Sequence, residues 1–228
     1  MTPDDAAFPR HAEPGRDTVG ALQRALLPAT VPVVAGARIA ARYLLADDEA
    51  GAGGDWYDAL ALPGGRVALV VGDVVGHGIG ATAAMAQLGA ILRARLRDGA
   101  GPAEAVRCLD RYAAEVPAAR ASTLCLAVLA CGTGELEYHT AGHPPPLLVS
   151  GGQARYLPGS GGGPLGTGGP IRFARTRMAP DDLLLLYTDG LVERPGRGAA
   201  GSTVELARAA VDATTDGTFE AGLSPDAA

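Results

Sequence analysis

Two continuous apolar runs in this chain each end in an aspartate that lies close to a glycine. The first run is Val67–Asp73 and the second is Leu183–Asp189. Short apolar runs bounded by turn residues predict buried central strands. A carboxylate at the end of such a strand is costly to desolvate unless a positive charge meets it. The two aspartates, Asp73 and Asp189, therefore indicate a shared cation, and carboxylate oxygens suit Mg²⁺ or Mn²⁺ better than zinc.

The remaining pattern predicts elements in the order strands, two helices, strands. Helices are predicted over residues 17–27, 78–97, 102–115 and, weakly, 203–211. Further strands are predicted over residues 38–45, 55–60, 122–131, 135–140, 147–149 and 171–178, with a glycine-rich loop or flap over 159–169. On the first helix, an apolar stripe is formed by Val19, Leu22 and Leu26. This order predicts an α+β sandwich instead of a repeating βαβ fold.

Composition excludes several functional classes. At 228 residues the chain can bury one good core, so a single folded domain is expected. The net charge of -6 argues against nucleic acid as the main partner. All 19 basic residues are arginine, and without lysine the chain has neither a P-loop nor Schiff-base chemistry.

Cysteine usage and the N-terminal residues indicate the compartment. The three cysteines, Cys108, Cys125 and Cys131, have no framework spacing, which is consistent with a reducing cytosol, and none has the spacing to arginine of a cysteine-phosphatase loop. The first residues contain no apolar core for a signal peptide, and no apolar run is long enough to span a bilayer. We therefore expect a soluble, cytoplasmic protein that does not bind membranes.

Residues 76–81 fit the G-x-G-x-x-A pattern of a dinucleotide-binding turn. That fold needs a further strand that ends in an acid for the ribose, whereas here the helix leads into a second helix at Pro102. Asp73 would also lie beside the pyrophosphate and repel it, unless a metal lay between them. The metal interpretation is therefore favoured, with a dinucleotide-binding enzyme as a distant alternative.

Two more acids, Asp55 and Asp58, lie in a strand that follows a pair of glycines. Alternation puts Asp55 and Tyr57 on one face of this strand and Asp58 on the other. Only one acid is then expected to face the metal, and Asp55, next to the glycines, is the better placed. The alternative is that both are solvated acids at a strand end.

The histidines and hydroxyls give weaker signals. His77, in the turn after Asp73, is open to three interpretations: an acid, a hydrogen-bond donor behind the metal ligands, or a turn residue. His143 lies in a rigid proline-rich turn, where it is a candidate for holding a loop in place. No cysteine or histidine has zinc-ligand spacing near either residue. The Ser122-Thr123 pair has no adjacent base, so a serine hydrolase is a weak interpretation.

Six motifs in order carry a resemblance to a known family. They are GGDWYD (53–58), GDVVGHG (72–78), STL (122–124), AGHPPPLLV (141–149), PLG (164–166) and YTDGLVER (187–194). Together they resemble the SpoIIE/RsbU-type branch of the PP2C (PPM) serine/threonine phosphatases, over roughly residues 20–197. Residues 22–28 resemble the helix that leads into such domains from an upstream sensor.

The resemblance implies a PP2C-like α-β-β-α sandwich of two mostly antiparallel sheets flanked by helices, with a pair of Mn²⁺ or Mg²⁺ ions at one edge. Asp73 matches the aspartate that bridges both ions, and the Val74 carbonyl matches a backbone ligand. Asp189 matches a ligand of one ion, and Asp55 an acid that holds the other directly or through water. Two such ions activate a water and clamp the phosphoryl oxygens, so no covalent phosphoenzyme is required. His77 is two positions further from the aspartate than the histidine of eukaryotic relatives, so its acid role is not transferred.

One departure from the family concerns the C-terminal residues. The family ends with an acidic pair that opens a final apolar strand, and its aspartate is another metal ligand. Only 39 residues follow Asp189 here, and Asp212, Asp216 and Asp226 have no strand behind them. We therefore expect the fold to lack its final strand, one metal site to be weak and activity to be reduced.

These observations lead to one functional hypothesis. The chain is expected to be a PP2C-type phosphoprotein phosphatase that acts on a phosphorylated anti-sigma-factor antagonist, a STAS-domain protein, in bacterial partner switching. The alternative is a catalytically impaired PP2C-like module that binds a partner. The expected organisation is a disordered tail (1–16), a linker or regulatory helix (17–28), the phosphatase domain (29–197) and a divergent C-terminal tail (198–228). The helix is too short to be stable alone and is expected to pack on the domain or to pair with a second copy in a homodimer.

Overall fold

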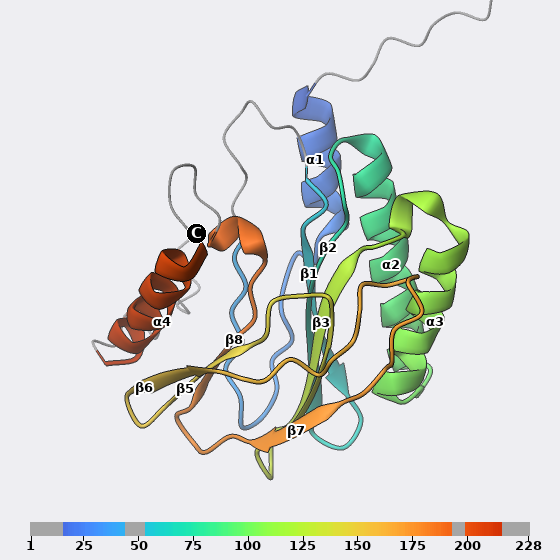
Figure 1. The fold of residues 1–228 in the computed structure, drawn as a ribbon. Helices are drawn as coiled ribbons and strands as arrows, with labels where there is room; N and C mark the ends of the chain where they lie inside the picture. Colours follow the sequence, from blue (N-terminus) through green and yellow to red (C-terminus); the bar gives the residue numbers. More distant parts are fainter. Residues whose placement is uncertain (1–15, 44–52, 193–198, 216–228) are drawn as a thin grey trace, which may run out of the picture.

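The chain folds into four layers in the order helix, sheet, sheet, helix (Figure 1). The computed structural model describes residues 16–43, 53–192 and 199–215. The larger sheet has the strand order β1-β2-β3-β4-β7 and the smaller has the order β6-β5-β8, and every neighbouring pair is antiparallel. The predicted α+β sandwich of two antiparallel sheets is confirmed.

The bounds of the elements are as follows. The large sheet contains β1 (Trp56–Leu62), β2 (Arg66–Asp73), β3 (Thr123–Ala130), β4 (Glu135–Ala141) and β7 (Ala174–Arg177). The small sheet contains β5 (Leu147–Ser150), β6 (Gln153–Tyr156) and β8 (Leu183–Leu185). The helices are α1 (Arg16–Leu26), α2 (Ile79–Arg97), α3 (Pro102–Glu115) and α4 (Ala199–Thr215), with 3₁₀ turns η1 (Pro117–Ala119) and η2 (Asp189–Leu191).

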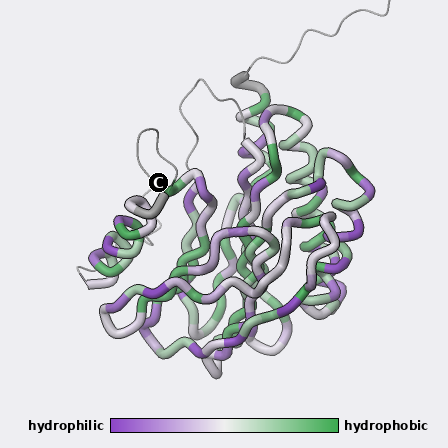
Figure 2. The backbone as a smooth tube through the Cα atoms, in the orientation of Figure 1, coloured by the Kyte–Doolittle hydropathy of each residue, from purple (hydrophilic) through white to green (hydrophobic). Residues whose placement is uncertain are grey.

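Each interface between layers has its own hydrophobic cluster. The largest joins α2 and α3 to the large sheet and includes Leu88, Leu109 and Leu126. A second, around Tyr138 and Leu148, joins the two sheets, and a third joins the small sheet to α4. Figure 2 shows hydrophobic stretches along the strands and along the helices that cover them. The largest cluster includes Trp56 and Val74, so it holds in place the ends of β1 and β2 that carry acidic residues.

Trp56, the first residue of β1, shows how closely β1, β2 and α2 pack. Its side chain is only 3% exposed. Gly72 of β2 is the residue that pairs with Trp56 in the β1–β2 ladder. A Cβ atom on Gly72 would lie 2.4 Å from the indole Nε1, so the ring fills the space that a side chain at Gly72 would need. The far side of the ring faces Gly89 of α2, where an added Cβ would lie 3.7 Å away. The glycine near the end of the first apolar run, Gly72, is therefore explained by packing.

Two strand predictions differ from the structure, and one strand was not predicted. Residues 38–43 form no ladder, and residues 44–45 lie outside the described part of the chain. The run 182–189 contains only the three-residue β8, which is half-buried and pairs only with β5 among the described residues. It is therefore an edge strand, and the prediction of a buried central strand was wrong for this run. β6 was missed, although two glycines between β5 and β6 are a hairpin signal.

The apolar stripe predicted on α1 is only partly buried against the domain. Val19 is buried, but Leu22 and Leu26 are 46% and 39% exposed. The residue that is buried completely is Gln23, and Leu27, just beyond the helix, packs against the main core. The helix therefore contacts the domain with a face that includes a polar residue, because that residue has hydrogen-bond partners there.

The glycine-rich segment 159–169 is a loop, as predicted, and it is packed against its neighbours. The side chain of Leu165 is buried, and its N–H donates to the Ser122 carbonyl at 2.9 Å. The N–H of Gly166 donates to the Asp110 carboxylate of α3 at 2.8 Å. The C-terminal helix α4 is longer than the predicted 203–211. None of the described helices is long and apolar enough to cross a bilayer.

Candidate metal centre

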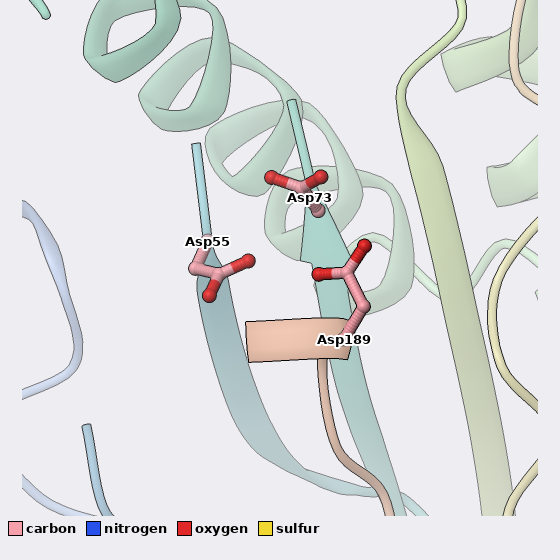
Figure 3. Close-up of side chains that lie close together, drawn as sticks. All are labelled: Asp55, Asp73 and Asp189. Atoms are coloured by element: carbon pink, nitrogen blue, oxygen red, sulfur yellow. The ribbon is translucent and has the colours of Figure 1, made fainter. Parts of the chain in front are cut away.

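Three aspartates from separate segments converge at one edge of the large sheet. Asp55 immediately precedes β1, Asp73 is the last residue of β2, and Asp189 opens η2 beyond β8. Because Trp56 pairs with Gly72 in the β1–β2 ladder, the first two acids lie at the same end of the hairpin. One carboxylate oxygen of each aspartate lies within 4.8 Å of those of the other two, and the three side chains point toward one another (Figure 3).

A close backbone approach between Gly54 and Val74 holds the first two acids together. The N–H of Val74 donates to the Gly54 carbonyl at 3.2 Å. A Cβ atom on Gly54 would lie 1.9 Å from the Val74 carbonyl oxygen, so only glycine fits. Val74 is buried, and its carbonyl as a backbone metal ligand stays a prediction.

The electrostatics of the three aspartates favour a cation. Burial, together with the charges of Asp55 and Asp189, raises the pKa of Asp73 to about 7. Burial also raises the pKa of Asp55, with Asp189 adding to the effect, while a hydrogen bond from Thr188 opposes it. Carboxylates that repel one another in this way are stabilised by a divalent cation, and a set of carboxylate oxygens is what Mg²⁺ and Mn²⁺ prefer. The residues present therefore fit such an ion.

The hydrogen bonds that fix Asp55 were not predicted from the sequence. Thr188, next to Asp189, donates its hydroxyl to Asp55 Oδ2 at 3.0 Å. Gln23 of α1 donates from Nε2 to the Gly53 carbonyl at 2.9 Å and to the Tyr43 hydroxyl at 2.5 Å, with the Asp55 carbonyl 3.3 Å away. The only sequence signal was a polar residue on the inner face of an amphipathic helix.

Tyr43 lies close to the same acids. Burial, together with the charges of Asp55 and Asp73, raises the pKa of its phenol to about 12. The phenol is therefore neutral at physiological pH, and its oxygen accepts the hydrogen bond from Gln23. Through these contacts α1 is joined directly to the segment that carries Asp55.

Asp58 lies apart from the three aspartates, as the alternation of β1 predicted. Its side chain is 5% exposed and pairs with Arg93 of α2, whose Nη2 lies 2.7 Å from Oδ2. The Ala59 N–H donates to its other carboxylate oxygen at 2.8 Å. Asp58 therefore anchors β1 to α2 instead of facing the cluster.

The two motif histidines lie in different environments. His77 is exposed in the turn between β2 and α2 and is not part of the carboxylate cluster. His143 is buried, with Nδ1 2.7 Å from the Thr123 hydroxyl and Nε2 3.0 Å from the Tyr187 carbonyl. Burial lowers the pKa of His143 to about 4, against the smaller opposing effects of Tyr187 and Asp189. The prediction that His143 holds a loop in place is confirmed by these contacts.

Other candidate groups do not form a second centre within the described residues. The three aspartates are the one cluster of three or more acidic, histidine or cysteine ligands found there. The cysteines are free, and burial raises the pKa of the Cys125 thiol to about 12. The Ser122 hydroxyl donates to the Ala119 carbonyl at 2.7 Å, a structural contact. Asp212 is exposed on α4, while Asp216 and Asp226 lie outside the described residues.

Comparison with known proteins gives a consistent picture. The family model described as Stage II sporulation protein E (SpoIIE) matches residues 63–225. The phosphoserine phosphatase RsbP of Bacillus subtilis (strain 168) is 26% identical over 147 residues, which are 61% of this chain and 36% of RsbP. The chain thus spans little more than a third of the length of that relative.

Solved structures resemble the fold. The RsbU and RsbW domains of Rv1364c from Mycobacterium tuberculosis share 49% identity with a TM-score of 0.76, over 81% of this chain and 53% of that one. The PP2C phosphatase domain of SpoIIE from Bacillus subtilis, solved with a fragment of its regulatory domain, shares 17% identity with a TM-score of 0.60, over 73% of this chain and 53% of that one. The second likeness concerns the fold alone, and it identifies the four-layer sandwich as PP2C-like.

Proposed function

This chain belongs to the SpoIIE family, and we propose that it is a metal-dependent PP2C-type phosphatase that hydrolyses phosphoserine or phosphothreonine in a protein. The observation that carries the proposal is the convergence of Asp55, Asp73 and Asp189, with ligand atoms within 4.8 Å of one another. The similarity to RsbP, a phosphoserine phosphatase, supports the same reaction class.

The proposed roles of the residues follow from their positions. Asp73, which has a carboxylate oxygen within 4.8 Å of those of both other aspartates, would bridge two ions, with Asp189 holding one and Asp55, assisted by the Val74 carbonyl, holding the other. When bound, Mn²⁺ or Mg²⁺ ions would neutralise phosphoryl oxygens and lower the pKa of a water. Thr188 orients Asp55 through its hydroxyl, and Gln23 fixes the backbone in front of it. In the overall reaction water adds to phosphorus, the P–O bond to the side chain breaks, and the serine or threonine oxygen takes up a proton.

The substrate class and the wider organisation are also proposals. By the family resemblance, the substrate is a phosphorylated anti-sigma-factor antagonist with a STAS domain, as part of partner switching. Residues 17–28 would form the linker helix, 29–197 the phosphatase domain and 198–228 a divergent tail. The exposed Leu22 and Leu26 of α1 are suited to pairing with a second copy, giving a homodimer. Light scattering of the chain and of a Leu22→Ser/Leu26→Ser variant tests this pairing, which is excluded if both are monomers.

Phosphate release tests the function itself. A phosphoserine-bearing STAS-domain protein and a generic phosphate ester are incubated with the chain, with Mn²⁺ or with a chelator. We expect hydrolysis of both substrates that depends on Mn²⁺. Hydrolysis that continues in the chelator would contradict metal dependence, and cleavage of the generic ester alone would contradict the substrate class.

One observation favours a second candidate, a catalytically impaired module that binds its partner. The cluster contains three carboxylates within the described residues, and Asp189 is exposed beyond an edge strand of three residues. A module of this kind would retain the phosphorylated partner in a pull-down without releasing phosphate at any Mn²⁺ concentration.

A further inference from the structure

The clustered aspartates come from two different sheets, so their relative position depends on what joins the sheets. Asp73 ends β2 in the large sheet, whereas Asp189 follows β8 in the small sheet. β8 stops at Leu185, so the last residues before Asp189 have no ladder to hold them. The main chain at Tyr187 is instead held by a side chain, His143, from the turn after β4.

The contacts of His143 fix which of its two ring nitrogens carries the hydrogen. Its Nε2 lies 3.0 Å from the Tyr187 carbonyl, which can only accept, so Nε2 must carry the hydrogen. In the neutral ring Nδ1 then has a free lone pair and accepts from the Thr123 hydroxyl at 2.7 Å. Both ring nitrogens are therefore used, and the ring is 6% exposed.

Both partners of His143 adjoin proposed metal ligands. Thr123 is the register partner of Asp73 across the β2–β3 ladder. Tyr187 lies two residues before Asp189, and Thr188 between them donates to Asp55. The imidazole thus spans from the strand beside one aspartate to the segment that carries another.

We propose that His143 is a positioning residue: through Thr123 and Tyr187 it sets the place of Asp189 relative to Asp73 and so determines the affinity for the ion that Asp189 holds. This inference rests on the proposed metal-dependent function. Side chains that hydrogen-bond directly to metal ligands typically change metal affinity about 10- to 100-fold when they are removed, and this range is the upper bound for His143, which acts through neighbouring residues. His143 contacts no carboxylate itself, so its effect should appear in binding of the metal before any substrate is present.

A second buried histidine provides a matched control. His139 of β4 is 1% exposed, with Nδ1 2.7 Å from the Arg172 carbonyl and 3.0 Å from the Ser160 hydroxyl. These contacts fix the loop before β7 and the glycine-rich loop, neither of which carries a clustered aspartate. Truncation of this residue has a similar cost in packing without the connection to the metal centre.

The experiment measures Mn²⁺ binding to the metal-free protein by calorimetry, without substrate. We expect His143→Ala to weaken the Asp189-dependent site by up to about 100-fold relative to wild type. His143→Gln, which can still donate to the Tyr187 carbonyl, should recover much of the affinity, whereas His139→Ala should bind Mn²⁺ like wild type. Melting temperatures in chelator verify that the two alanine variants are folded. If His143→Ala fails to fold, Thr123→Val removes one of the two contacts at nearly constant volume and should weaken the same site by a smaller factor.

The outcomes separate this inference from the proposed function. Wild-type affinity in folded His143→Ala, or in Thr123→Val where His143→Ala does not fold, overturns the positioning role and leaves the metal-dependent function in place. Equal weakening in His143→Ala and His139→Ala also overturns it, because the effect would then follow from lost packing. No Mn²⁺ binding by the wild-type protein overturns both the inference and the proposed function.

Discussion

At the scale of single residues, burial and the neighbouring acids raise the pKa of the Asp73 carboxyl to about 7. Asp73→Asn should abolish Mn²⁺-dependent phosphate release, because the proposed bridging carboxylate is lost. In chelator at pH 8 the same change should raise the free energy of unfolding by about 1–2 kcal/mol, less than the full shift implies because the carboxyl is only partly buried. Urea unfolding and phosphate release provide the two measurements. Undiminished activity in this variant would contradict the metal assignment.

The same carboxyl predicts a pH dependence of stability. Its pKa is near 3.9 in the unfolded chain and about 7 in the folded, metal-free protein, so the folded state binds the extra proton between these values. The stabilisation of the folded state by protonation of Asp73 is fully present below pH 4 and is lost as the pH rises through 7. The urea midpoint of the metal-free protein should therefore fall between pH 5 and pH 8. The fall should be smaller in Asp73→Asn and with saturating Mn²⁺; an identical fall in all three samples would assign it to other groups.

The residues of the cluster were predictable, but the groups that fix them were not. Asp73 was identified because it ends an apolar run before glycines, and Asp55 by alternation in its strand. That all three aspartates bind metal is still a prediction. Thr188 donates to a carboxylate 133 residues earlier in the chain, and Gln23 to a carbonyl 30 residues later. Contacts between residues so far apart in sequence depend on how the sheets stack. The periodicity of apolar residues within one segment gives no information about that stacking.

At the scale of the elements, the crossing of Gly54 over the end of β2 sets the spacing between the β1 and β2 acids. Gly54→Ala would place a Cβ 1.9 Å from the Val74 carbonyl oxygen, which must force the strand ends apart. We expect a destabilisation of about 1–3 kcal/mol and a loss of Mn²⁺ affinity. Gly201→Ala in α4, where an added Cβ meets nothing within 4 Å, should be neutral or slightly stabilising. Thermal melts and calorimetry of both variants test this, and equal behaviour of the two would refute it.

Helices were easier to predict than strands in this chain. α2 and α3 match their predicted ranges because they are long runs rich in helix-forming residues, bounded by glycine and proline. For the strands, an apolar run shows burial but not which neighbour pairs with it. Residues 38–43 form no strand ladder within the described part of the chain, and β8 ends after three residues, before the buried Tyr187. Both differences arise from sheet partners, which lie far away in sequence.

At the scale of the whole molecule, the two proposed metal sites should differ in strength. Asp55, Asp73 and the Val74 carbonyl would hold one ion, whereas the other would rely on Asp189, which is exposed on η2. The C-terminal aspartate that the family pattern supplies to one of its two metal sites has no match in this sequence. An ion that lacks one carboxylate ligand has more water and less negative charge around it. Calorimetric Mn²⁺ titration should therefore give one stronger and one much weaker site, with turnover only at high metal concentration. Two equally tight ions would mean that another acid takes part.

A gain-of-function variant tests the same idea from the other side. β8 pairs only with β5 among the described residues, so its outer edge is the place for an additional strand. Appending a strand that opens with an Asp-Asp pair should strengthen the weaker Mn²⁺ site and raise turnover. The same strand with an Asn-Asn pair serves as the control, and equal gains from both would assign the effect to the strand and not to its carboxylates.

Trp56 gives the molecule a fluorescent reporter of its own. It is the only tryptophan in the sequence and adjoins Asp55, and its indole lies between β2 and α2 with no hydrogen-bond partner for Nε1 in the described part of the chain. Because both elements shield the ring from water, its emission spectrum should shift to longer wavelength as soon as the hairpin separates from the helix. The state of the chain beside the metal centre can therefore be followed optically, without attaching a dye.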